Sequence, residues 1–130
     1  MLRLSLLSLL VASSFAFGAD DPKAAARLET FNKEIKPMLE KSCLSCHGKD
    51  GKPGKHGFSV YTLDNTVKGG KEEGPGITWG NADKSSLYRL SLLGATARGE
   101  DMAMPPKKDT KHEPLTLDQL AKMKAWIEAK

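Results

Sequence analysis

The stretch KSCLSCHGK, Lys41 to Lys49, holds both cysteines of this 130-residue chain. Cys43 and Cys46 are separated by two residues, and His47 follows the second cysteine directly. A Cys-x-x-Cys pair alone has several uses in proteins, including a redox disulfide and half of a zinc site. Neither of these uses by itself accounts for a histidine directly after the second cysteine, so this histidine reduces the number of sites that the pair could form.

Cys-x-x-Cys-His is the pattern by which proteins attach c-type haem. Two cysteines at this spacing can reach both vinyl groups of one haem and form thioethers with them. His47 then lies beside the second thioether, where it can serve as the proximal ligand of the iron. Because the chain has a single motif of this kind, we predict one covalent haem c, held by Cys43 and Cys46.

Three other kinds of site compete with haem attachment. A thioredoxin-like redox pair lies between a strand and a helix, whereas here a helical pattern precedes the motif and glycines follow it. A structural zinc site needs four ligands, and beyond the motif only His56 and His112 could complete it. A disulfide suits an exported chain but leaves His47 unexplained.

The identity of the second axial ligand of the iron distinguishes an electron carrier from a protein whose haem has an open site for small ligands. Methionine opposite histidine raises the reduction potential and closes the iron to small ligands. Met38 and Met123 are expected in the core, whereas Met102 and Met104 lie in the downstream loop GEDMAMPPKK. Two prolines after Met104 stiffen this loop and lower the entropic cost of holding its sulfur. We therefore predict Met104 as the distal ligand, with Met102 as the fallback.

Other side chains remain candidates near the iron. His56, His112 or an open sixth position are the alternatives to methionine. Trp79 could donate its indole N–H to a haem propionate, or pack on the haem edge. Pro53 could offer its carbonyl to the second nitrogen of His47 and so fix the orientation of the ring.

The first 18 residues, MLRLSLLSLLVASSFAFG, have the layout of a secretory signal peptide: one positive charge, an apolar run, then small residues. The apolar run is shorter than the roughly 20 residues of a spanning helix. We predict cleavage near Gly18, export to the periplasm and a single domain over residues 19–130. Removing 18 of 130 residues, Arg3 among them, leaves 112 residues and lowers the formal charge from +4 to +3. The net charge is mildly positive and the lysines are scattered along the sequence, so the chain shows no basic patch of the kind that binds nucleic acid.

The first helix is predicted from about Pro22 to Lys41. Asp21 can cap its start, and Pro37 is expected to break or kink it. Apolar residues recur in this segment at helical spacing and are expected in the core. They are Ala24, Leu28, Phe31, Ile35 and Leu39.

A second, shorter helix is predicted over residues 85–93. Asn81 or Asp83 can cap its start, and Gly94 follows it as a stop signal. The stretch GFSVYTL, residues 57–63, could be extended, but nothing alternates long enough to build a sheet.

The last helix follows a capping box formed by Thr116 and Gln119. Four of its apolar residues line one side, with Trp126 flanking them, and all five are expected in the core. The four are Leu117, Leu120, Met123 and Ile127. With three helical segments and no sheet, the chain is predicted to be all-α.

Five stretches carry a resemblance to a known family: IKPMLEKSCLSCHG, KGG, GPGITWGNADKSSLYRL, MAMPP and LTLDQLAKMKAWI. In these stretches the chain resembles a class I mono-haem c-type cytochrome, and most of all the planctomycete-type cytochrome c domain. The resemblance implies a small class I cytochrome c fold, with three to four short helices and long loops around one covalent haem. It also implies that the first and last helices cross near the haem. The ligand set it implies is Cys43 and Cys46 as thioethers, His47 as proximal ligand and Met104 as distal ligand.

The function expected from the motif and the resemblance is periplasmic electron transfer by a carrier that is not an enzyme. The alternatives are a haem-binding sensor or small-ligand module with a weak or open sixth position, and a haem-free thiol redox protein. We expect a monomer whose partners are redox proteins, acidic or membrane-bound ones included, with no nucleic acid and no membrane span after cleavage. The chain departs from the family at Trp79, where proline is common, and in the lysine- and glycine-rich insert of residues 52–57.

Overall fold

The computed structural model describes residues 21–48, 52 and 54–129, and in these residues the backbone is helical without a strand. The α-helices are α1 (Pro22–Thr30), α2 (Lys36–Ser42), α3 (Leu63–Lys68), α4 (Ser86–Thr96) and α5 (Leu117–Glu128). A π-helical segment (Phe31–Ile35) joins α1 to α2, and 3-10 turns occupy Lys55–Gly57 and Ala82–Lys84. The predicted all-α class is confirmed. The predicted signal peptide lies outside the described residues.

The first helix continues through the expected break at Pro37. Asp21 caps its start, since the Asp21 carboxylate accepts the N–H of Lys23 at 3.0 Å. Ahead of Pro37 the helix widens into the π segment, in which the Lys36 N–H donates to the Phe31 carbonyl five residues back. Pro37 therefore occupies the first turn of α2, where a missing N–H is tolerated.

The core lies where α5 crosses the π segment. Phe31 stacks on Trp126 with ring centroids 6.0 Å apart, and Trp126 Nε1 donates to the Arg27 carbonyl at 3.3 Å. The large apolar side chains that are fully buried are Phe31, Ile35, Leu39, Val60, Leu120, Met123 and Ile127. Three predicted core positions are wrong, because their side chains are exposed: Ala24, Leu28 and Leu117.

The structure corrects the predicted end of the second helix. α4 runs to Thr96, so Gly94 lies inside the helix instead of ending it. The glycine is needed for space, since a Cβ at Gly94 would lie 2.0 Å from the carbonyl oxygen of Met104. Asn81 caps the 3-10 turn ahead of α4, and the N-cap position of α4 belongs to Ser85.

The periodicity did not predict α3. Thr62 caps it by accepting the Asn65 N–H at 3.3 Å, which is a short N-terminal signal within a polar stretch. The capping box of α5 is confirmed: Thr116 Oγ1 accepts the Gln119 N–H at 3.2 Å, and Gln119 Oε1 accepts the Thr116 N–H at 2.9 Å. The last helix therefore begins where the sequence predicts.

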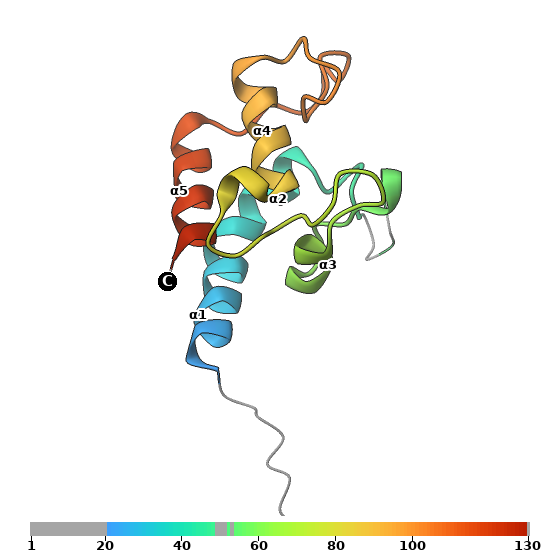
Figure 1. The fold of residues 1–130 in the computed structure, drawn as a ribbon. Coiled ribbons are helices and arrows are strands. Elements are labelled where there is room, and N and C mark those ends of the chain that lie inside the picture. The colour runs from blue at the N-terminus through green and yellow to red at the C-terminus, as the bar shows by residue number, and fades with distance from the viewer. Residues whose placement is uncertain (1–20, 49–51, 53, 130) are drawn as a thin grey trace, which may run out of the picture.

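Figure 1 shows α5 on one side of the continuous α1–α2 helix and α3 on the other, and α4 packs against α5. The long connection between α4 and α5 projects at the end of the molecule where α2 leads into residues 43–48. No helix among the described residues is long and apolar enough to cross a membrane.

Candidate functional site

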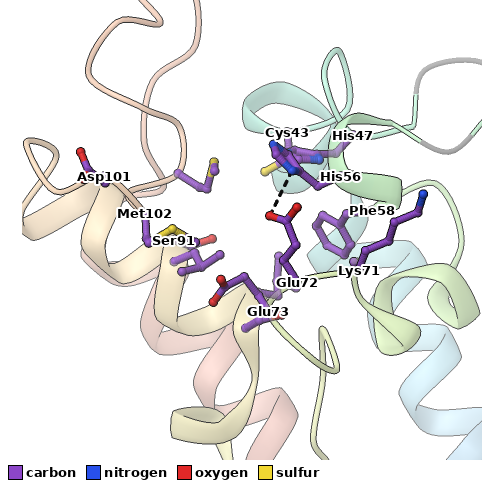
Figure 2. Close-up of a pocket in the computed structure, with 15 residues that line it drawn as sticks. Cys43, His47, His56, Phe58, Lys71, Glu72, Glu73, Ser91, Asp101 and Met102 are labelled. Atoms are coloured by element: carbon purple, nitrogen blue, oxygen red, sulfur yellow. Dashed lines mark ion pairs between the residues drawn. The ribbon is translucent and has the colours of Figure 1, made fainter.

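A cavity of about 240 Å³ lies between the turn after α2 and the loop after α4. Figure 2 shows Cys43 and His47 on one side of it, across from Met102 and Asp101. Its other lining residues come from the chain between the motif and α4, from α4 itself, and from the loop after α4 that carries Met102 and Met104, here called the distal loop. They are His56, Phe58, Gly70, Lys71, Glu72, Glu73, Ser86, Leu87, Leu90, Ser91 and Met104. Cys43, His47, Met102 and Met104 thus face one cavity, whereas Cys46 does not line it.

The turn that carries the Cys-x-x-Cys-His motif is fixed by backbone hydrogen bonds. The Cys43 N–H donates to the Leu39 carbonyl at 2.8 Å, which continues the hydrogen-bonding of α2 into the turn. The N–H groups of Cys46 and His47 both donate to the Cys43 carbonyl, at 3.2 and 2.8 Å. This tight return brings the side chains of Cys43 and His47 to the same cavity.

Gly54 and Lys55, in the lysine- and glycine-rich insert whose role the sequence did not indicate, pack against this turn. A Cβ at Gly54 would lie 2.3 Å from the Cys46 carbonyl oxygen and 2.5 Å from the α-carbon of His47. The Lys55 N–H donates to the Cys46 carbonyl at 3.0 Å. Glycine at position 54 therefore lets the insert lie directly on the backbone of the motif.

The two cysteines are not joined in a disulfide. Burial raises the pKa of the Cys43 thiol to about 12, and the neighbouring Cys46 adds to the shift. The Cys43 thiol is therefore neutral at physiological pH. Thiol redox proteins need the opposite, because the attacking thiol must be a thiolate.

Burial also lowers the pKa of His47, so the imidazole favours the neutral form that ligates metals. Its Nδ1 atom is buried and has no hydrogen-bond partner among the described residues. Pro53, the predicted partner of this nitrogen, lies outside those residues. The Phe58 ring packs beside the imidazole, with centroids 5.2 Å apart.

The two loop methionines are held differently. The Met104 N–H donates to the Leu90 carbonyl of α4 at 3.0 Å, and its carbonyl lies against Gly94. Met102 lies in the preceding turn and is 38% exposed. The backbone of Met104 is therefore anchored to a helix. Cys43, a histidine whose lowered pKa favours its neutral form, and a methionine meet at one cavity, and together with Cys46 of the same motif they form a donor set that fits a covalent haem.

The other predicted ligands lie elsewhere or have partners. His56 lines the cavity and pairs with Glu72, its Nδ1 lying 3.3 Å from the Glu72 carboxylate. His112 does not line it, and both of its ring nitrogens are hydrogen-bonded. Met38 and Met123 are buried in the core, as predicted. Within the described residues no three His, Cys, Asp or Glu side chains gather as they would around a metal ion.

Trp79 belongs to an aromatic cluster away from this cavity. The Arg27 guanidinium lies 4.2 Å from the Trp79 ring centroid, and Trp126 meets the same ring edge-on at 5.0 Å. Trp79 lines a separate hollow near α1 and α3. Its contacts therefore join α1 to α5.

Sequence reasoning missed three acidic side chains at the cavity: Glu72, Glu73 and Asp101. Glu73 lies 3.7 Å from Arg89, which projects from α4. These residues fall in polar, glycine-containing stretches whose composition indicates only a loop. The position of Glu72 and Glu73 depends on the path of the chain from α3 to α4, and that of Asp101 on the loop after α4.

A family model described as Planctomycete cytochrome C matches residues 43–108. No curated protein and no solved structure matches the chain significantly. The matched segment is half of the chain, begins at Cys43 and extends past Met104. It therefore includes the cavity-lining residues from both sides. The chain belongs to the planctomycete cytochrome c family.

Proposed function

We propose that this protein is a periplasmic electron carrier whose single covalent haem c alternates between the ferric and ferrous states. The observation that carries the proposal is the shared cavity, to which the motif contributes Cys43 and His47 and the distal loop contributes Met104. Membership of a cytochrome c family supports a haem protein of this kind.

Cys43 and Cys46 would hold the haem by thioethers, with His47 and Met104 as axial ligands. When bound, the haem supplies a one-electron couple. The polypeptide would keep both axial side chains in place in either oxidation state of the iron. Hydrogen bonds from Cys46 and His47 to the Cys43 carbonyl hold the proximal side, and the bond from Met104 to Leu90 holds the distal side.

Met104 is preferred to Met102 because of the way its backbone is held. A ligand that stays bound through both oxidation states needs little freedom, and Met104 is fixed to α4 by the Leu90 carbonyl and by contact with Gly94. Met102 is more exposed and lies in a turn. The assignment rests on this difference in anchoring.

The thiol redox alternative is disfavoured by the neutral Cys43 thiol, whose pKa burial raises to about 12. The sensor alternative requires an open or weakly held sixth position. The methionine sulfurs across the cavity argue against an open position, and spectroscopy separates the two cases.

The test is a spectroelectrochemical titration of protein matured with the haem-ligation machinery. We expect one reversible one-electron transition, low-spin spectra in both states and a weak methionine–iron band in the ferric form. A five-coordinate, high-spin spectrum would assign the protein to the sensor class. A spectrum without any haem band would assign it to the thiol redox class.

Export and partners form part of the same proposal. The N-terminal sequence has the layout of a signal peptide, and covalent haem attachment is typical of exported cytochromes. We propose that the mature protein is monomeric and exchanges electrons with other redox proteins. Cell fractionation tests the localisation, and a periplasmic marker enzyme should accompany the protein.

A further inference from the structure

A chain of hydrogen bonds connects the haem-attachment turn to the segment after the distal loop. Ser45, between the two cysteines, places its Oγ 2.8 Å from His112 Nε2. His112 Nδ1 lies 2.7 Å from the Asp109 carboxylate. The Asp109 and His112 side chains are only 16% and 22% exposed. Residues 67 positions apart in the sequence are thus joined by one side-chain hydrogen bond.

The segment that presents His112 is itself fixed. Asp109 Oδ1 accepts the N–H groups of Lys111 and His112, at 2.9 and 3.2 Å. Arg98, just past the end of α4, donates through Nη2 to the carbonyls of Asp109 and His112, at 2.6 and 3.0 Å. Residues 109–112 therefore form a turn held to Arg98 at one side and to Ser45 at the other.

The chemistry of the three side chains indicates which of them donates and which accepts in each of these hydrogen bonds. A carboxylate only accepts hydrogen bonds, so Asp109 holds the proton of His112 on Nδ1. In the neutral imidazole Nε2 then carries no proton and accepts the hydroxyl hydrogen of Ser45, for which Cys46 Sγ at 3.8 Å is the longer alternative acceptor. Each group has a suitable partner, which favours one arrangement of the three side chains.

We propose that Ser45, His112 and Asp109 form a latch that holds the distal loop against the haem-attachment turn and so limits the release of Met104 from the iron. The proposal rests on the proposed function. Met104 lies between two anchors: α4 on one side, through Leu90 and Gly94, and the latch on the other. His112 and Asp109 lie beyond the residues that the family model matches, so the latch extends past the matched segment.

The same three residue types occur in hydrolase triads, but the surroundings favour the latch. A nucleophilic serine needs a substrate cavity and donors for a developing oxyanion. Neither Ser45 nor His112 lines the cavity described above. Ser45 also lies between the two cysteines that would carry haem, so its fixed position serves the turn.

The test measures imidazole binding to the ferric, haem-loaded protein, because imidazole must displace the distal ligand. Ser45→Ala removes one net hydrogen bond, so we expect imidazole affinity to rise about two- to tenfold. Ser45→Thr keeps a hydroxyl and should restore most of the wild-type affinity. Thr110→Ala, an exposed change in the same segment, is the control and should have no effect.

A double-mutant cycle separates the latch from general destabilisation. If Ser45 and His112 act through one bond, the Ser45→Ala/His112→Ala double variant should bind imidazole no more tightly than His112→Ala alone. Additive effects would contradict the latch. Covalent labelling of Ser45 by a fluorophosphonate, with loss of fluoride, would also overturn it and assign the three residues to catalysis.

Hydrogen exchange gives a second readout that does not depend on the distal ligand. The Met104 amide, bonded to the Leu90 carbonyl, should exchange faster in Ser45→Ala than in Thr110→Ala. Unchanged exchange together with unchanged imidazole affinity would overturn the latch. If the wild-type protein lacks the methionine–iron band, the assignment of Met104 fails, while this exchange comparison still tests the latch.

Discussion

The α-carbon of Gly94 faces the backbone of Met104 so closely that a Cβ at position 94 would lie 2.0 Å from the Met104 carbonyl oxygen and 2.6 Å from its carbonyl carbon. A helix interior normally disfavours glycine relative to alanine by up to about 1 kcal/mol. The glycine is therefore retained here for the space it leaves. It allows the loop that carries the distal candidate to lie directly on α4.

Gly94→Ala reverses the usual effect of removing a helix glycine. We expect destabilisation by roughly 1–3 kcal/mol, because the added methyl displaces backbone rather than a flexible side chain. The methionine–iron band should weaken as the loop moves. Gly99→Ala is the matched control, since a Cβ there meets nothing within 4 Å. A Gly94→Ala protein with raised stability and an unchanged band would contradict this role.

Met104→Ala should abolish the methionine–iron band and lower the reduction potential, because a sulfur donor that favours ferrous iron is lost. Met102→Ala should keep the band. Absorption spectroscopy and a potentiometric titration of both variants distinguish the two residues. A band that survives in Met104→Ala and disappears in Met102→Ala would move the ligand by two positions.

The Cys-x-x-Cys-His motif predicts candidate haem ligands because their chemistry lies in contiguous sequence, and the structure places two of them, Cys43 and His47, at one cavity. The capping box at Thr116 likewise fixed the start of α5, since both partners lie within one turn. Local signals of this kind can be read without knowledge of the fold.

The sequence led to wrong or missing predictions where a feature depends on structure that the local pattern does not show. Gly94 resembles a stop signal, but it is a contact point for a segment ten residues further along the chain. Pro37 suggests a break, but the π segment ahead of it keeps the helix continuous. The bond from Ser45 to His112 spans 67 positions, and no local pattern indicates it.

Glu73→Gln should raise the reduction potential, because a negative charge beside the cavity stabilises ferric over ferrous iron. The expected shift is on the order of tens of millivolts, since Glu73 is partly exposed and its charge is partly screened. Glu113→Gln, which removes an exposed charge that does not line the cavity, should shift the potential less. Equal shifts in the two variants would mean that only net charge matters.

Thr116→Ala should destabilise the protein by about 1 kcal/mol, because the Gln119 N–H loses its acceptor at the start of α5. Thermal unfolding measures the change, and the haem spectrum should stay the same. Thr116→Ser keeps the hydroxyl and should restore most of the stability. A change in the methionine–iron band in Thr116→Ala would show that the start of α5 influences the distal side.

The most direct test of the central claim is the intact mass of the exported protein after extraction in acid and organic solvent. We expect the mass of a chain beginning near Ala19 plus one haem, because thioethers at Cys43 and Cys46 survive conditions that remove unattached haem. The Cys43→Ala/Cys46→Ala variant should give the mass of the polypeptide alone. A wild-type protein that loses its haem on extraction, or never carries one, would contradict covalent attachment and the electron-transfer function built on it.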